Sequence, residues 1–138
     1  AEAARNAGVI TADEFAVFQN AGYMGLYGGM TVDDIHRKKN LEVGQKILDY
    51  MGSTELIANL FRISQTEEKL RKDSVNSADT ATAVHYKVGS EVREAIEKIG
   101  GTMPEDLPTP EKSIAQLEKE QLQRLKQQAL DGQLMLDE

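Results

Sequence analysis

The sequence predicts an all-α protein: a compact multi-helix domain with a glycine-rich interhelical turn, and a C-terminal helix behind a proline-containing linker. Three observations predict this class. Apolar residues recur at steps of three and four along most of the chain, which is the spacing of one helix face. Threonines and serines stand where helix starts are expected and glycines where helices stop. No stretch of any length alternates apolar and polar residues as a half-buried strand does.

The first half of the chain predicts four short helices. Residues 1–7 end one helix, with Gly8 as its C-terminal stop. Thr11 caps the next, and a glycine-rich turn over residues 22–29 follows it. Thr31 and Asp34 form a near capping box for a short helix that runs toward residue 39. A further helix is expected from about residue 42 to residue 51, ended by Gly52.

The second half predicts longer helices. Ser53 caps a helix with a wide apolar face, which consists of Leu56, Ile57, Leu60, Phe61 and Ile63. Ser77 starts an amphipathic helix of about six turns that Gly100–Gly101 stops. The core domain is therefore expected over residues 1–101 and a stiff linker over 102–109. A C-terminal amphipathic helix is expected over 110–130, begun by Thr109 and Pro110, and a tail over 131–138.

Composition limits the function classes. The net charge is −7 and there is no cysteine, so a chain that simply coats nucleic acid, a disulfide framework and thiolate chemistry are not expected. No apolar run is long enough to span a membrane and no signal-peptide pattern is present, so a cytoplasmic location is expected. The opening "AEAARNAGV" lacks a starting methionine and already looks helical, which suggests a fragment of a longer protein.

The stretch "AGYMGLYGGMTVDDIHRKKN", residues 21–40, is the candidate functional segment. Its glycines lack the spacing of a dinucleotide loop or a P-loop, and no strand precedes them. One reading is a turn in which the glycines supply positive φ and close backbone approach. The other is a nucleic-acid or partner surface, because tyrosine faces stack on bases and basic side chains neutralise phosphates. The residues of that surface would be Tyr23, Tyr27, His36, Arg37, Lys38, Lys39 and Lys46.

No catalytic constellation, cofactor motif or metal-ligand set stands out in the sequence. The two histidines are His36, in the basic run, and His85, which shares a helix face with valines and is expected beside the core. Adjacent carboxylates such as Glu67 and Glu68 point about 100° apart on a helix, so they suit neither a shared proton nor a metal. We therefore expect a protein that is not an enzyme and that needs no cofactor.

Several stretches together resemble one family. "LYGG", "MGSTEL", "QTEEKLR" and "GGTMPEDLPTPE" are similar to the C-terminal half of bacterial DNA-damage-inducible protein D, over residues 1 to about 120. In that family an N-terminal domain resembling the BRO and phage-antirepressor DNA-binding module precedes this half. The resemblance implies an SOS-response protein connected with RecA recombinase filaments on single-stranded DNA. It brings no catalytic residues.

The tail contains a separate short motif. Gln133, Leu134 and Leu136 resemble the start of peptides that bind the bacterial sliding clamp, although Asp137 stands where such peptides usually carry phenylalanine. The alternative is a short apolar end that packs back on the domain.

Three functions follow as hypotheses. The first is a regulatory module that binds a RecA-type filament, and possibly single-stranded DNA, through the basic and tyrosine surface. The second is a dimerisation or scaffold domain for a DNA-binding N-terminal half that is absent from this chain, with a homodimer formed through the thin apolar stripe of the C-terminal helix. The third is a nuclease, for which the sequence offers no cluster of metal-binding carboxylates.

Overall fold

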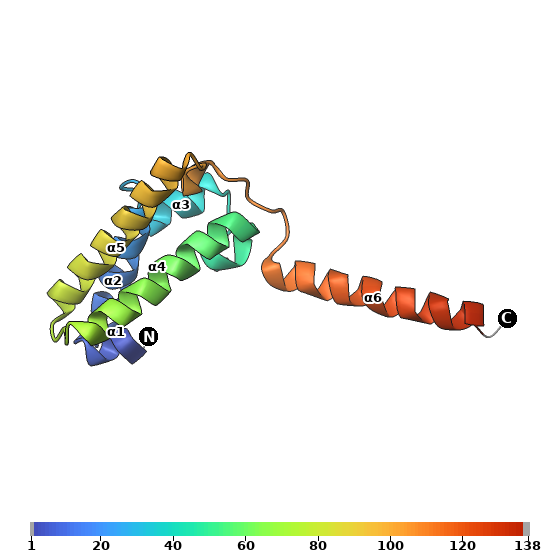
Figure 1. Ribbon diagram of the computed structural model, residues 1–138, viewed down its shortest axis with the longest axis horizontal. Coiled ribbons are helices and arrows are strands. Elements are labelled where there is room, and N and C mark those ends of the chain that lie inside the picture. Colours follow the sequence, from blue (N-terminus) through green and yellow to red (C-terminus); the bar gives the residue numbers. More distant parts are fainter. Residues whose placement is uncertain (1, 137–138) are drawn as a thin grey trace.

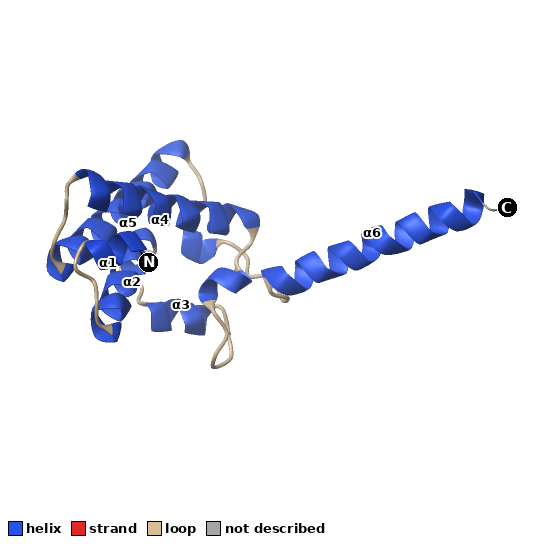
Figure 2. Cartoon of the chain, turned by 90° about the horizontal axis from the view of Figure 1, so that it is seen from below, coloured by secondary structure: helices blue, strands red, loops and turns tan. Residues whose placement is uncertain are grey.

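The computed structural model describes residues 2–136 of the chain, and their side chains as far as residue 132. This part is built of helices and contains no strand, which confirms the all-α prediction (Figure 2). The α-helices are α1 (Glu2–Asn6), α2 (Ala12–Leu26), α3 (Val32–Lys38), α4 (Ser53–Lys72), α5 (Ala78–Ile99) and α6 (Ile114–Leu136). Two short 3₁₀ helices, η1 (Ile47–Tyr50) and η2 (Pro104–Asp106), lie in the connections.

Local sequence signals set several helix ends as predicted. Thr11 caps α2 and Thr31 caps α3, each by accepting a bond of 3.1 Å from the backbone N–H three residues on. The carboxylates of Glu14 and Asp34 return the bond to the cap residues, so both capping boxes are complete. Ser77 caps α5 in the same way through its hydroxyl. Gly8 and Gly100, at φ +102° and +86°, end α1 and α5.

The glycine-rich segment is only partly a turn. Gly28 and Gly29 have positive φ and form the turn, but Gly22 and Gly25 lie inside α2, which runs to Leu26. These two glycines instead allow close packing of α2 against α5, the most extensive helix pair of the fold. A Cβ at Gly25 would stand 2.3 Å from the carbonyl oxygen of Tyr86. The partner glycine on α5, Gly89, would place a Cβ 2.7 Å from the carbonyl oxygen of Gly22.

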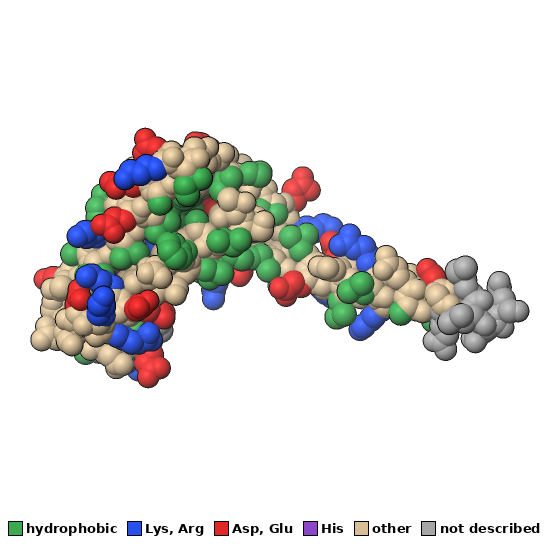
Figure 3. All heavy atoms as spheres, in the orientation of Figure 1, with side chains coloured by type: hydrophobic (Ala, Val, Ile, Leu, Met, Phe, Trp, Pro, Cys, Tyr) green, Lys and Arg blue, Asp and Glu red, His purple; other side chains and the backbone are tan. Residues whose placement is uncertain are grey.

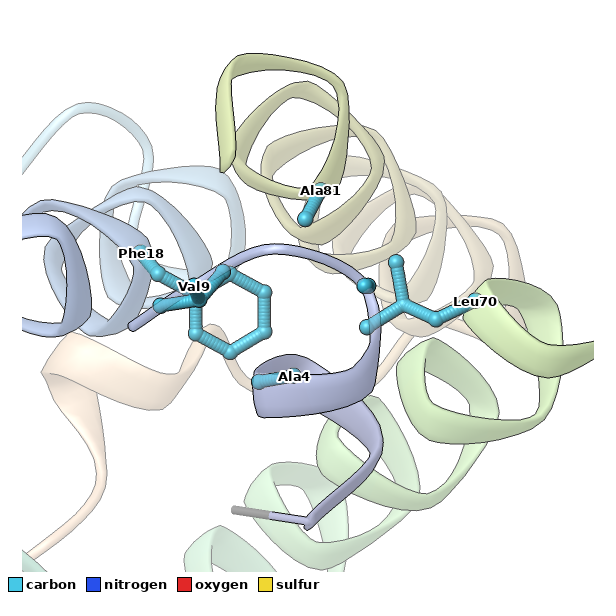
Figure 4. Packing of buried hydrophobic residues seen from close by; sticks show 6 residues of the cluster. Ala4, Val9, Phe18, Leu70 and Ala81 are labelled. Atoms are coloured by element: carbon cyan, nitrogen blue, oxygen red, sulfur yellow. The ribbon is translucent and has the colours of Figure 1, made fainter. Parts of the chain in front are cut away.

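Two apolar clusters form the core between the helices. One, at the end of the domain where α1 packs, joins residues of α1, the connection that follows it, α2, α4 and α5: Ala4, Ala7, Val9, Phe18, Leu70 and Ala81 (Figure 4). The other, nearer α3, contains Leu26, Tyr27, Ile35, Ile47, Met51 and Val92. Among the described residues, no helix is both long and apolar enough to cross a membrane.

Three predicted helix boundaries were wrong. Residues 42–46 are a loop with Gly44 at φ +87°, so only the 3₁₀ turn η1 remains of the helix expected at 42–51. Gly52, without a side-chain bond, is the cap residue of α4 in place of Ser53. The last helix begins at Ile114 rather than 110, because Ser113 and Gln116 exchange backbone–side-chain bonds of 3.2 and 3.0 Å that start the helix there.

The wide apolar face predicted for α4 is buried only in part, since Leu56 and Ile63 are half-buried. The residues of α4 that are buried are mainly polar: Glu55, Asn59, Arg62, Thr66 and Leu70. The apolar Ile57, Leu60 and Phe61 face solvent with 66%, 50% and 54% of their surfaces exposed. In the space-filling view, hydrophobic side chains gather on the surface over α4 and α5 (Figure 3).

The linker is fastened to the body and α6 extends away from it. Arg93 of α5 holds Glu105 of η2 through two bonds of 2.7 and 2.8 Å, and also donates to the carbonyl of Leu26 at the end of α2. Beyond this clamp α6 projects from the domain (Figure 1), and the helical element that it chiefly contacts is η1. Leu117, Leu122, Leu125 and Leu130 along it are exposed.

Candidate functional site

A chain of polar side chains runs through the interior between α2, α3, α4 and α5. It begins at Lys39, directly after α3, whose ammonium lies 2.7 Å from a carboxylate oxygen of Glu55 on α4. The two side chains are 6% and 1% exposed, so this is a buried ion pair. The ammonium also donates to the carbonyl of Tyr50 at 3.2 Å and to the hydroxyl of Thr109 at 3.3 Å. Lys39 therefore fastens η1 and the end of the linker to α4.

The other carboxylate oxygen of Glu55 continues the network. It accepts a short hydrogen bond from the hydroxyl of Tyr27, and that hydroxyl in turn accepts from the amide of Asn59 at 3.0 Å. Burial, followed by the bond to Glu55, raises the pKa of Tyr27. Tyr27 therefore stays a neutral donor, and the negative charge of Glu55 remains between Tyr27 and Lys39.

The far half of the network centres on Arg62. Its guanidinium donates to Asn59 Oδ1 at 2.9 Å, lies 2.6 Å from His85 Nε2 and stacks over the ring of Tyr23 with 4.6 Å to the centroid. His85 Nδ1 lies 2.8 Å from the carbonyl oxygen of Phe18, which can only accept, so Nδ1 carries the proton and Nε2 accepts from Arg62. Burial and then the charge of Arg62 lower the pKa of His85 to about 4. His85 is therefore neutral near pH 7.

Two cavities adjoin the network. One of about 110 Å³ lies beside Arg62 and His85, with Phe15, Phe18 and Ile63 among its apolar walls. The other, of about 320 Å³, lies under the linker beside Lys39, Glu55 and Tyr27 and is more polar. Both cavities are lined by residues of the buried network and by charged residues nearer the surface, which are Glu67 in the first cavity and Lys38, Glu105 and Asp106 in the second. Among the described residues, no three histidine or acidic side chains gather as a metal site.

The structure separates the predicted surface residues into two groups. Tyr27 is 1% exposed and Lys39 is buried in its ion pair, so neither presents its side chain to an external base or phosphate. Tyr23 is half-buried under Arg62. Four residues remain at the surface or near it, and two of them are paired within the chain: Arg37 with Asp34 at 2.7 Å and Lys38 with Asp106 at 3.5 Å.

The other two surface residues differ in their contacts. His36 is half-buried, and its Nε2 lies 3.0 Å from the carbonyl oxygen of Gln45. Lys46 is exposed. The backbone of the tail motif Gln133, Leu134 and Leu136 belongs to the last turns of α6. The side chains of that motif lie outside the described residues, so clamp binding stays a prediction.

Sequence reasoning missed Glu55, Asn59 and Arg62 as members of a buried site. Their spacing offered a signal, because positions 55, 59, 62 and 66 recur at helical steps and hold only polar residues. The sequence placed His85 beside the core on its helix, and the structure shows it buried, 3% exposed. Its partners, 23 and 67 residues away in sequence, could not be deduced from the sequence alone.

The fold and this interior define an all-α domain in which the polar side chains of the buried network bind one another. Comparison with known proteins gives the family. The profile of the family described as the DinD C-terminal domain matches residues 1–117, and the chain belongs to that family. DNA damage-inducible protein D of Escherichia coli strain K12 is 62% identical over 117 residues, which are 85% of this chain and 43% of that protein. The chain thus spans less than half of that relative's length. No solved structure matches the chain.

Proposed function

We propose that this chain is a non-catalytic protein-interaction module of a DNA-damage response protein, and that its partner is a RecA-type recombinase filament on single-stranded DNA. The name of the E. coli relative supports the damage response. The filament as partner rests on the family resemblance given above. The observation that carries the proposal is the inverted helix α4, which turns Ile57, Leu60 and Phe61 to solvent and a row of polar residues inward.

The exposed apolar side of α4 has the composition of a protein interface. Ile57, Leu60 and Phe61 are each at least half exposed, and Phe61 borders a groove of about 450 Å³ between α4 and α5. The groove floor is apolar, with Val84, Val88, Val92 and Ala95, and its edges carry Lys69, Lys87 and Glu91. Contiguous apolar surface with a charged rim marks protein contacts more often than nucleic-acid contacts.

The basic segment supports a secondary role in this contact. Arg37 and Lys38 already interact with Asp34 and Asp106, so a phosphate would have to compete with these carboxylates. With a net charge of −7 on the chain, direct affinity for bare DNA should be low and strongly salt-dependent. We therefore propose that His36, Arg37, Lys38 and Lys46 add long-range attraction while the α4 side supplies specific contacts.

The test is fluorescence anisotropy of a labelled single-stranded oligonucleotide, bare and recombinase-coated, titrated with this chain and its variants. Phe61→Glu should weaken binding to the coated strand by about 2 kcal/mol or more, roughly 30-fold, because a central aromatic anchor becomes a buried charge. Arg37→Glu with Lys38→Glu should weaken it less, and the loss should shrink at higher salt.

A matched control introduces the same charge elsewhere. Val17 on α2 is also a largely exposed apolar residue, outside the α4/α5 groove, so Val17→Glu should leave binding within twofold of the wild type. Equal losses of binding for Val17→Glu and Phe61→Glu would show that the added negative charge, and not its position on α4, weakens the binding. Undiminished binding by a folded Phe61→Glu variant would remove the α4 side from the proposal.

A second function, self-association, is supported by α6. This helix projects from its own domain and keeps leucines exposed, and at 23 residues it is about 35 Å long, similar to α4 and α5. We propose that a second copy of this chain covers that stripe. Leu122→Glu with Leu125→Glu should then convert a dimer to a monomer in analytical ultracentrifugation. A wild-type chain that sediments as a monomer at about 1 mM, where even weak pairs form, would exclude this function.

A further inference from the structure

Arg62 is a buried cation without a carboxylate partner among the described residues. It is 2% exposed, and its polar partners are the amide oxygen of Asn59 and the ring nitrogen of His85, which are both uncharged. Its Nε has no hydrogen-bond partner in the part of the chain that the structure describes. The face of Tyr23 supplies a cation–π contact but no counter-charge. A guanidinium buried in this way is costly unless an anion compensates it.

Neither His85 nor Glu55 neutralises this charge. His85 donates from Nδ1 to the carbonyl of Phe18 and is neutral, and protonating it would only add a second positive charge. Glu55 is the buried anion of the network, but its carboxylate is paired with Lys39 and is separated from Arg62 by Asn59. The buried set of Lys39, Glu55 and Arg62 therefore carries an excess of one positive charge, located at Arg62.

The cavity beside Arg62 has the size and lining for a small organic anion. Its volume of about 110 Å³ exceeds several times the ~10–15 Å³ that one water-sized group needs by the same kind of measure. Arg62 and His85 line it together with apolar Phe15, Phe18 and Ile63. Glu67 also lines it, with its carboxylate 3.9 Å from Arg71. A carboxylate at the cavity wall opposes a dianion more than a monoanion.

We propose that this cavity binds a small monocarboxylate with a short apolar chain, whose carboxylate compensates the charge of the Arg62 guanidinium in the cavity wall. The apolar chain of the ligand contacts the two phenylalanines and Ile63. Such a ligand compensates the buried charge and fills the apolar part of the cavity, which an inorganic ion does not. This site is independent of the filament contact, because neither Arg62 nor Phe15 belongs to the α4/α5 groove.

The test uses butyrate as the probe and the Nε–Hε resonance of Arg62 as the readout, in this 138-residue chain labelled with ¹⁵N. The resonance is identified by its contacts with the ring of Tyr23, over which the guanidinium lies. Butyrate should shift it saturably with a Kd of about 1 mM, as expected for so small a ligand. Neutral butyramide and chloride at equal concentration should not shift it in a saturable way.

A blocking variant makes the test specific to the cavity. Gln19 is exposed and lines the cavity, so Gln19→Trp should weaken butyrate binding about tenfold without disturbing the core. Gln65→Trp, at an exposed position outside this cavity, is the matched control and should bind as the wild type. The proposal is overturned by an unsaturated or absent shift at about 10 mM butyrate, by an equal response to butyramide, or by tighter binding of inorganic phosphate.

Discussion

Removing the positive partner of the buried ion pair should destabilise the domain strongly. Lys39→Met keeps much of the side-chain volume but deletes an ammonium that lies 2.7 Å from Glu55 and also bonds the carbonyl of Tyr50 and the hydroxyl of Thr109. Glu55, 1% exposed, would keep a charge with only the Tyr27 hydroxyl to stabilise it. Leaving one member of a buried pair unpaired costs about 3–5 kcal/mol. That is a large part of the ~5–15 kcal/mol available to a domain.

The double variant separates the charge from the packing. With Lys39→Met, Glu55→Gln removes the stranded charge while its amide oxygen still accepts from Tyr27. The double variant should therefore recover about 2 kcal/mol or more relative to Lys39→Met alone. Urea unfolding followed by circular dichroism gives the free energies of unfolding, provided that the denaturant slope is unchanged.

The reasoning would be refuted by a loss below about 1 kcal/mol for Lys39→Met, which is the range of exposed pairs. It would be refuted equally by a double variant no more stable than the single one, because the stranded charge would then not be the cause. Lys38→Met is the control, since Lys38 forms an exposed ion pair, in which its ammonium lies 3.5 Å from an exposed carboxylate oxygen of Asp106. It should change the free energy of unfolding by less than about 1 kcal/mol.

Two further predictions concern His85 and the α2/α5 contact. The folded-state pKa of His85, about 4, lies below the unfolded value of 6.5, so the unfolded chain takes up the proton first as pH falls. The contribution of neutral His85 to the free energy of unfolding is therefore complete above about pH 6.5 and is lost as the pH falls toward 4. Wild type should lose about 2 kcal/mol more than His85→Gln between pH 7 and pH 5 in urea unfolding, and parallel pH profiles would contradict this. Gly89→Ala should destabilise the domain by about 3 kcal/mol or more, because the new Cβ would lie 2.7 Å from the backbone of α2. Gly132→Ala in α6 is the control, and because its Cβ would meet no atom within 4 Å, it should keep or raise the stability. Equal thermal melting points for the two glycine variants would refute the packing argument.

Local chemistry explains what the sequence predicted well. A threonine hydroxyl and a carboxylate three residues on, as in Thr11 with Glu14, satisfy free backbone groups without help from distant residues. The same holds for Ser77 and for the left-handed Gly100. The wrong boundaries have local causes as well. Thr109 and Pro110 offered a helix start, but Thr109 instead accepts a bond from Lys39, and the helix begins after Ser113.

Contacts between distant residues explain what could not be predicted. Tyr27 and Glu55 are 28 residues apart, and His85 and Phe18 are 67 apart, so no window of the sequence contains the network. The expectation that Tyr27 and Lys39 form an outer surface followed from residue type alone. Aromatic and basic side chains do bind nucleic acid, but here each has a buried partner on α4 that removes it from the surface.

The inverted helix α4 links the interior to the proposed interface. Residues two positions apart on a helix point about 200° apart, so Ile57 faces away from Glu55 and Phe61 faces away from Asn59. Because Glu55, Asn59 and Arg62 point inward to the network, Ile57 and Phe61 point outward. Burying them in the same chain would expose the polar face and break every bond of the network. The exposed apolar surface of α4 is thus a consequence of the polar network inside the domain.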